Sequence, residues 1–82
     1  MSFAAHSVPR EPDLFQAAED DLRVAESRAA LARAEASLET ARVRYMRSPH
    51  GGHGQRLRDF QEATHQALKA ALALRQALAA RL

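Results

Sequence analysis

Two histidines in a short glycine-containing segment are the residues of this sequence best suited to chemistry. His50 and His53 are three positions apart, and a pair of imidazoles can bind zinc. A zinc site is normally held by three or four fixed ligands, however, and the segment holds no Cys, Asp or Glu at ligand spacing. The other two histidines, His6 and His65, lie well away from it. We therefore expect surface loop histidines, with no bound metal and no other cofactor.

Catalysis needs a positioned nucleophile, base or acid in a concave pocket. Ser48 near His50 is one candidate pair, but it has neither an orienting acid nor a rigid platform. The neighbouring carboxylates of Asp20 and Asp21 are explained more simply by a solvated acidic patch near a helix start. We predict a protein without enzymatic activity.

The segment that contains His50 and His53 is flanked by positive charge. Five arginines are candidates for binding an anion such as a nucleic-acid phosphate: Arg42, Arg44, Arg47, Arg56 and Arg58. No Asp or Glu lies between Thr40 and Arg58. Base stacking would require exposed aromatic rings, but Tyr45 and Phe60 are assigned to the core, and the net charge of the chain is only +2. A nucleic-acid-binding accessory protein is therefore an alternative interpretation.

Two stretches with a seven-residue hydrophobic repeat flank and position the histidine segment. The first is marked by Val24, Leu31, Leu38 and Tyr45, and the second by Leu57, Thr64, Ala71 and Leu78. Folding the chain back at residue 51 pairs these residues in reverse order and also brings Ser27 to Leu74, Ala34 to Ala67, and Ala41 to Phe60. Small residues facing large ones allow packing as in coiled coils. The sequence predicts an all-α fold, an antiparallel two-helix hairpin.

The chain divides into four segments. We expect a loose N-terminal arm over residues 1–11, a first helix over 12–47, a loop over 48–54 and a second helix over 55–82. Pro12 suits a helix start, and Pro49 disfavours helical geometry at Ser48. All the glycines lie in the loop, where they permit positive φ. The acids near the start of the first helix, Asp21 among them, are expected beside Arg75 and Arg81.

The first helix has a second apolar stripe, about 170° from the seam at 100° per residue. The second helix has leucines flanking its seam, which widen its apolar surface beyond what one neighbour covers. Together these residues form the expected partner interface: Leu14, Phe15, Ala18, Leu22, Ala25, Ala29, Ala32, Ala36, Val43, Leu68, Leu72 and Leu82. We predict a homodimer that forms a four-helix bundle, with a different protein partner as the alternative.

Length and composition limit the other options. A chain of 82 residues without cysteine has neither disulfides nor thiolate ligands to stabilise it, which leaves oligomerisation. The absence of cysteine fits a reducing compartment such as the cytoplasm, but it fits many exported bacterial proteins equally. The longest apolar run, 70–74, is far shorter than the about 20 residues of a membrane span.

These features favour a self-associating interaction module, a small adaptor or chaperone-like subunit. The abundance of Ala and Arg suggests a bacterial source. A further alternative is a small helical subunit or co-chaperone of a bacterial secretion system, because such proteins share this size and outline. That likeness is architectural only, since the chain has no tryptophan for the Trp-x-Gly turn of secreted hairpin proteins.

Overall fold

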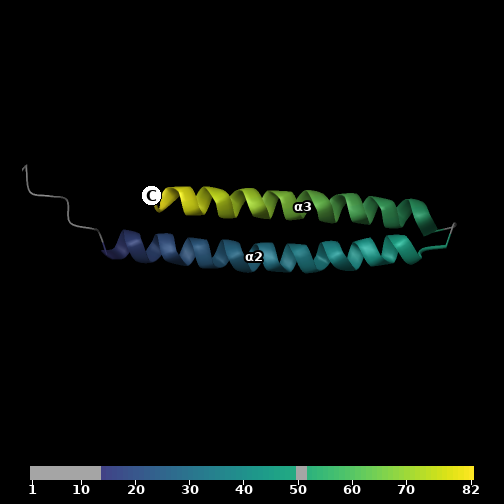
Figure 1. Cartoon of the computed structure of the whole chain (residues 1–82), viewed down its shortest axis with the longest axis horizontal. Coiled ribbons are helices and arrows are strands. Elements are labelled where there is room, and N and C mark those ends of the chain that lie inside the picture. The colour runs from purple at the N-terminus through teal and green to yellow at the C-terminus, as the bar shows by residue number, and fades with distance from the viewer. Residues whose placement is uncertain (1–13, 50–51) are drawn as a thin grey trace, which may run out of the picture.

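Two long helices run side by side in opposite directions (Figure 1). The computed structural model describes residues 14–49 and 52–82, so the predicted arm at 1–11 and His50 lie outside the described residues. Helix α2 spans Leu14–Arg47 and helix α3 spans His53–Ala80. Within the described ranges there is no strand, which confirms the predicted all-α hairpin.

The turn between the helices is tighter than the sequence indicated. Helix α2 ends at Arg47, and the amide of Ser48 donates to the Tyr45 carbonyl at 3.3 Å. The amide of Gly52 donates to the Pro49 carbonyl at 3.0 Å, so α3 begins at His53, two residues earlier than expected. Gly52 has a φ of −106°, so the turn does not use a positive φ in its described part.

Helix α3 also ends earlier than expected. The amides of Arg81 and Leu82 donate to carbonyls three residues back, on Leu78 and Ala79, both at 3.2 Å. Such bonds tighten the last turn of a helix and satisfy carbonyls that have no partner in regular α geometry. The helix therefore stops at Ala80.

The face that α2 turns towards α3 is the predicted one. Val24 is only 4% exposed. The other seam residues are partly buried, namely Ser27, Leu31, Ala34, Leu38, Ala41 and Tyr45. Their alternating spacing of three and four keeps them on one side of a helix.

The seam of α3 is rotated relative to the prediction. Leu57, Phe60, Ala67 and Leu74 are buried or partly buried as expected, but Thr64 and Ala71 are exposed and Leu78 is 36% exposed. The second row of the seam is instead made of alanines: Ala63, Ala70 and Ala77. Alanines opposite the larger side chains of α2 let the two backbones approach closely, and this contact leaves several leucines of α3 outside the hairpin.

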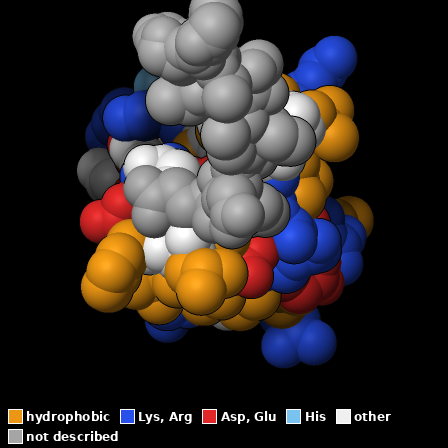
Figure 2. Space-filling model, turned by 90° about the vertical axis from the view of Figure 1, so that its left-hand side faces the viewer, with side chains coloured by type: hydrophobic (Ala, Val, Ile, Leu, Met, Phe, Trp, Pro, Cys, Tyr) orange, Lys and Arg blue, Asp and Glu red, His pale blue; other side chains and the backbone are white. Residues whose placement is uncertain are grey.

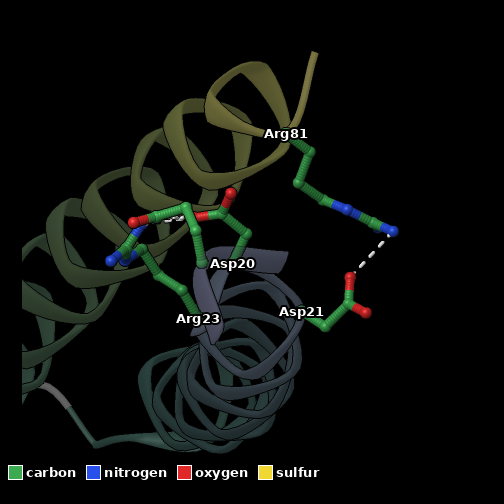
Figure 3. A network of polar contacts seen from close by, with 5 residues as sticks. Asp20, Asp21, Arg23 and Arg81 are labelled. Atoms are coloured by element: carbon green, nitrogen blue, oxygen red, sulfur yellow. Dashed lines mark hydrogen bonds and ion pairs between the residues drawn. The ribbon is translucent and has the colours of Figure 1, made fainter. Parts of the chain in front are cut away.

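Side-chain contacts link the helices at both ends. Near the turn, the rings of Tyr45 and Phe60 have centroids 5.6 Å apart. At the open end, the guanidinium of Arg81 reaches across from α3 to Asp21 on α2, with a nitrogen–oxygen distance of 2.9 Å (Figure 3). This ion pair was among the contacts expected from the sequence, and it joins the end of α3 to the start of α2.

Candidate interaction surfaces

The side of α2 that points away from α3 is apolar, and we call it the outer face of α2. It comprises Phe15, Ala18, Leu22, Ala25, Ala29, Ala32, Ala36, Val43 and Met46. Phe15 is 84% exposed and Leu22 58%, while Val43 is partly buried. Figure 2, seen from the open end, shows hydrophobic side chains gathered along the lower edge, which is the α2 side.

Met46 extends this face and was not among the predicted interface residues. It is 69% exposed and lies one turn beyond Val43. The three-and-four spacing that connects Leu22 to Ala25 and Ala29 leads to Met46, so the sequence repeat could have predicted this residue. Glu39, which also falls on this stripe, interrupts it, but the apolar spacing resumes at Val43 and continues to Met46.

A second apolar surface, the leucine strip of α3, consists of Leu68, Leu72, Leu78 and Leu82. Leu68 is 66% exposed, Leu72 is 53% exposed and the terminal Leu82 is fully exposed. Three of the four were predicted as interface residues, whereas Leu78 was predicted for the seam. Leu14, the remaining predicted interface residue, begins α2 and is 79% exposed.

Charged side chains flank the outer face of α2 on both sides. Arg28 and Glu35 lie along one edge, and Glu26 and Arg33 along the other. All four are exposed, and none makes a hydrogen bond or ion pair with another described residue. The middle of the outer face is therefore bordered by unpaired charges of both signs.

Some of the charges nearer the ends of α2 are paired within the chain. The guanidinium of Arg42 donates to both carboxylate oxygens of Glu39, at 3.0 and 2.6 Å. This hydrogen bonding lowers the pKa of Glu39 and raises that of Arg42. Asp20 accepts from Gln16 at 2.9 Å and from Arg23 at 3.2 Å (Figure 3). The ion pair with Arg42 balances the negative charge of Glu39, the charged residue of the apolar stripe.

The candidate anion-binding arginines share the loop end but differ in their contacts. Arg42 is held by Glu39, and Arg58 donates to the Gln55 side chain at 3.0 Å. Arg44, Arg47 and Arg56 make no ion pair with the described residues. Of these, Arg44 and Arg47 are exposed at the C-terminal end of α2.

A cluster of polar and aromatic groups closes the turn. The rings of His53 and Tyr45 have centroids 4.4 Å apart, His53 Nε2 lies 3.0 Å from the Tyr45 hydroxyl, and Nδ1 lies 3.3 Å from Ser48 Oγ. The Ser48 hydroxyl donates to the Tyr45 carbonyl at 2.9 Å. Because the Ser48 hydroxyl proton is used in this bond, Ser48 Oγ accepts from His53 Nδ1–H, and His53 Nε2 accepts from the Tyr45 hydroxyl.

This cluster pairs Ser48 with His53, whereas the sequence suggested His50. The Ser48 hydroxyl donates to a backbone carbonyl, and both imidazole nitrogens of His53 have partners. The side chains of Tyr45, Ser48 and His53 therefore form a hydrogen-bonded group over the turn, which we call the clasp. The described residues contain no group of three or more His, Cys, Asp or Glu placed to hold a metal.

The hollows of the described surface include two that are large enough for water. The larger, of about 360 Å³, lies between the helices near the turn and has Arg44 and Asp59 at its rim. The smaller, of about 240 Å³, lies at the open end around Asp20, Asp21 and Arg81. Neither contains a buried polar side chain without a hydrogen-bond partner.

No helix in the described part of the chain has an apolar stretch of the length that a membrane span needs.

In comparisons with known proteins, no family model, no curated protein and no solved structure matched the chain. The role of these surfaces is therefore inferred from their own residues.

Proposed function

We propose that this protein is a non-enzymatic helical-hairpin interaction module that self-associates through four helices and acts as a small adaptor or chaperone-like subunit. One observation carries the proposal. The buried residues in the described part of the chain are Val24, Ala67 and Ala77, whereas large apolar side chains, Phe15, Leu22 and Leu68 among them, are more than half exposed.

The energetic imbalance favours a partner. Burying a leucine or phenylalanine side chain contributes about 1.5–3 kcal/mol, and the whole stability of a domain is about 5–15 kcal/mol. Leaving the outer face of α2 and the leucine strip of α3 in water would forgo a sum of the same order. Contiguous exposed apolar surfaces of this kind mark interaction sites.

The test is the mass of the purified chain by light scattering over a concentration series, with circular dichroism on the same samples. We expect a helical dimer of about twice the 9.0 kDa chain mass. Ala32→Glu, which places a charge in the middle of the outer face, should give a monomer at concentrations where the wild type is dimeric. Ala73→Glu adds the same charge at an exposed position of α3 outside both apolar surfaces and should leave the dimer intact.

A helical monomer at every concentration would contradict self-association. A dimer unaffected by Ala32→Glu would show that the outer face of α2 is not the contact.

The unpaired Arg44 and Arg47 support a second candidate, an anionic partner such as a nucleic acid at the loop end. Its test is fluorescence anisotropy with a labelled single-stranded oligonucleotide. Binding that weakens steeply with salt and is abolished by Arg44→Glu would favour it. Binding that is insensitive to either change would eliminate it.

A further inference from the structure

The outer face of α2 has small residues in its middle and large residues towards its ends. Ala25, Ala29, Ala32 and Ala36 occupy the centre. Phe15 and Leu22 lie on the N-terminal side, and Val43 and Met46 on the C-terminal side. Two copies of such a surface fit one another when antiparallel, because alanines then meet in the middle and large side chains meet at both ends.

We infer that a second copy of this chain docks on the outer face of α2, with the two α2 helices antiparallel and a twofold axis midway between Ala29 and Ala32. This rests on the self-association proposed above and specifies its geometry. The contact layers on either side of the axis are Ala29 with Ala32, Ala25 with Ala36, Leu22 with Glu39, Ala18 with Val43, and Phe15 with Met46. Two-fold symmetry makes each layer occur twice.

The flanking charges agree with this register. Antiparallel helices bring residues on the same edge of the contact face close together. In this register every charged pair along the two edges has opposite signs: Arg28 with Glu35, Asp21 with Arg42, and Glu26 with Arg33. Symmetry doubles each pair, so opposite charges border the contact on both sides.

Other arrangements place like charges together. Sliding one helix by seven residues in either direction sets Glu35 against Glu35 or Arg28 against Arg28 of the second copy. Parallel helices would place Arg28 beside Arg33 and Asp21 beside Glu26. Like charges in contact oppose association, so the charges select the antiparallel register that the side-chain sizes also favour.

The central charged pairs can form without breaking contacts within either chain. Arg28, Glu35, Glu26 and Arg33 are exposed and have no partner among the described residues, so pairing with a second copy breaks no existing contact. Towards the ends, Asp21 uses one carboxylate oxygen for Arg81, which leaves the other free to accept. The register therefore depends mainly on the four central charges.

The placement of the two faces also sets the shape of the dimer. The outer face lies nearly opposite the seam on α2, so the second copy lies on the side of α2 away from α3. The four helices then form a row in the order α3, α2, α2, α3, and the closed bundle expected from the sequence is replaced by a single layer. The leucine strip of α3 stays outside this contact.

Disulfide trapping tests the register, since the chain has no cysteine of its own. An equal mixture of Ala29→Cys and Ala32→Cys chains, mildly oxidised, should give mainly the mixed disulfide, identified by mass spectrometry. A disulfide forms only when the two Cα atoms are within about 7 Å. The matched control mixes Ala25→Cys with Ala32→Cys; Ala25 faces Ala36 in this register, so little mixed product is expected.

Charge exchange provides an independent test that needs no cross-link. Arg28→Glu alone and Glu35→Arg alone each create like-charge pairs, and we expect each to weaken dimerisation about tenfold or more by analytical ultracentrifugation. Mixing the two variants should restore dimers, because each new glutamate then faces an arginine.

The outcomes separate the register from self-association itself. A wild-type dimer that gives no 29–32 cross-link and no rescue by mixing would overturn the register and leave the proposed function standing. Efficient 29–29 cross-links in the Ala29→Cys chain alone would indicate either parallel helices or an antiparallel register centred on Ala29, and either result would also overturn it. A wild-type chain that is monomeric throughout would overturn both proposals.

Discussion

The outer face of α2 and the leucine strip of α3 are both apolar and exposed, but they are built differently. The first has alanines at its centre and charges of both signs along its edges, a pattern that would favour some partners and registers over others. The second presents Leu68, Leu72, Leu78 and Leu82 around the exposed Arg75, with no acidic residue after Glu62. A surface with large apolar side chains and charge of one sign offers affinity without a fixed register. We expect α2 to provide self-recognition and α3 to contact a different partner.

The largest effect is expected from a change that removes both surfaces by destroying the hairpin. Ala34→Glu puts a carboxylate into the seam, where Ala34 is partly buried, and an unpaired buried charge costs about 3–5 kcal/mol. Thermal melting followed by circular dichroism should show loss of the folded hairpin. Ala73→Glu serves as the control. Unchanged melting would mean that the seam does not run through Ala34.

The next effect distinguishes the two surfaces directly. The double variant Leu68→Gln and Leu72→Gln should leave the dimer mass unchanged, because the strip lies outside the proposed contact between α2 helices. It should also reduce binding of the apolar dye ANS to the dimer several-fold. Light scattering and dye fluorescence provide these readouts. A monomeric double variant would place the strip within the dimer contact and favour a closed bundle.

A smaller effect is expected at the turn. His53→Ala removes the contacts to Tyr45 and Ser48, and a hydrogen bond contributes about 0.5–1.5 kcal/mol net. The free energy of unfolding from urea titration should fall by about 1–2 kcal/mol. His65→Ala is the matched control, since His65 is exposed and makes no hydrogen bond, ion pair or ring contact with other described residues. Equal effects of the two variants would argue against the clasp.

The smallest effect concerns the pKa of one side chain, that of Glu39. Arg42→Ala removes the hydrogen bonds that lower the pKa of Glu39, so that pKa should rise towards its usual range, as measured by NMR titration of the carboxyl group. Because the folded-state pKa is lowered, the stabilising contribution is present at neutral pH and is lost as pH falls through that value. Arg33→Ala, at an unpaired arginine, should leave the pKa of Glu39 unchanged.

Much of the hairpin could be predicted from the sequence because α2 has one unambiguous row of larger apolar residues. Val24, Leu31, Leu38 and Tyr45 are separated from the outer face by charged positions on both sides, so only one rotation of the helix buries them. In α3 the apolar positions cover more than half the circumference, and the repeat alone does not fix the rotation. The structure shows the alanine side of α3 inward, which a preference for burying the largest side chains would not suggest.

The turn lay beyond sequence reasoning for a different reason. Ser48, Tyr45 and His53 belong to two helices and the segment between them, and no periodic pattern connects them. Their contact depends on α3 starting two residues earlier than the loop composition indicated. The apolar surfaces, by contrast, followed from spacing, apart from Met46 and Leu78.

The scarcity of buried residues within one hairpin has a thermodynamic consequence. When a folded chain gains much of its burial from a second copy, unfolding and dissociation become one linked equilibrium, and the melting temperature depends on how much protein is present. We expect the melting temperature to rise as the chain is concentrated, and a concentration-independent value would place all of the stability within the single hairpin. At low abundance such a protein is also partly unfolded, so its cellular level would control how much of it is available to bind.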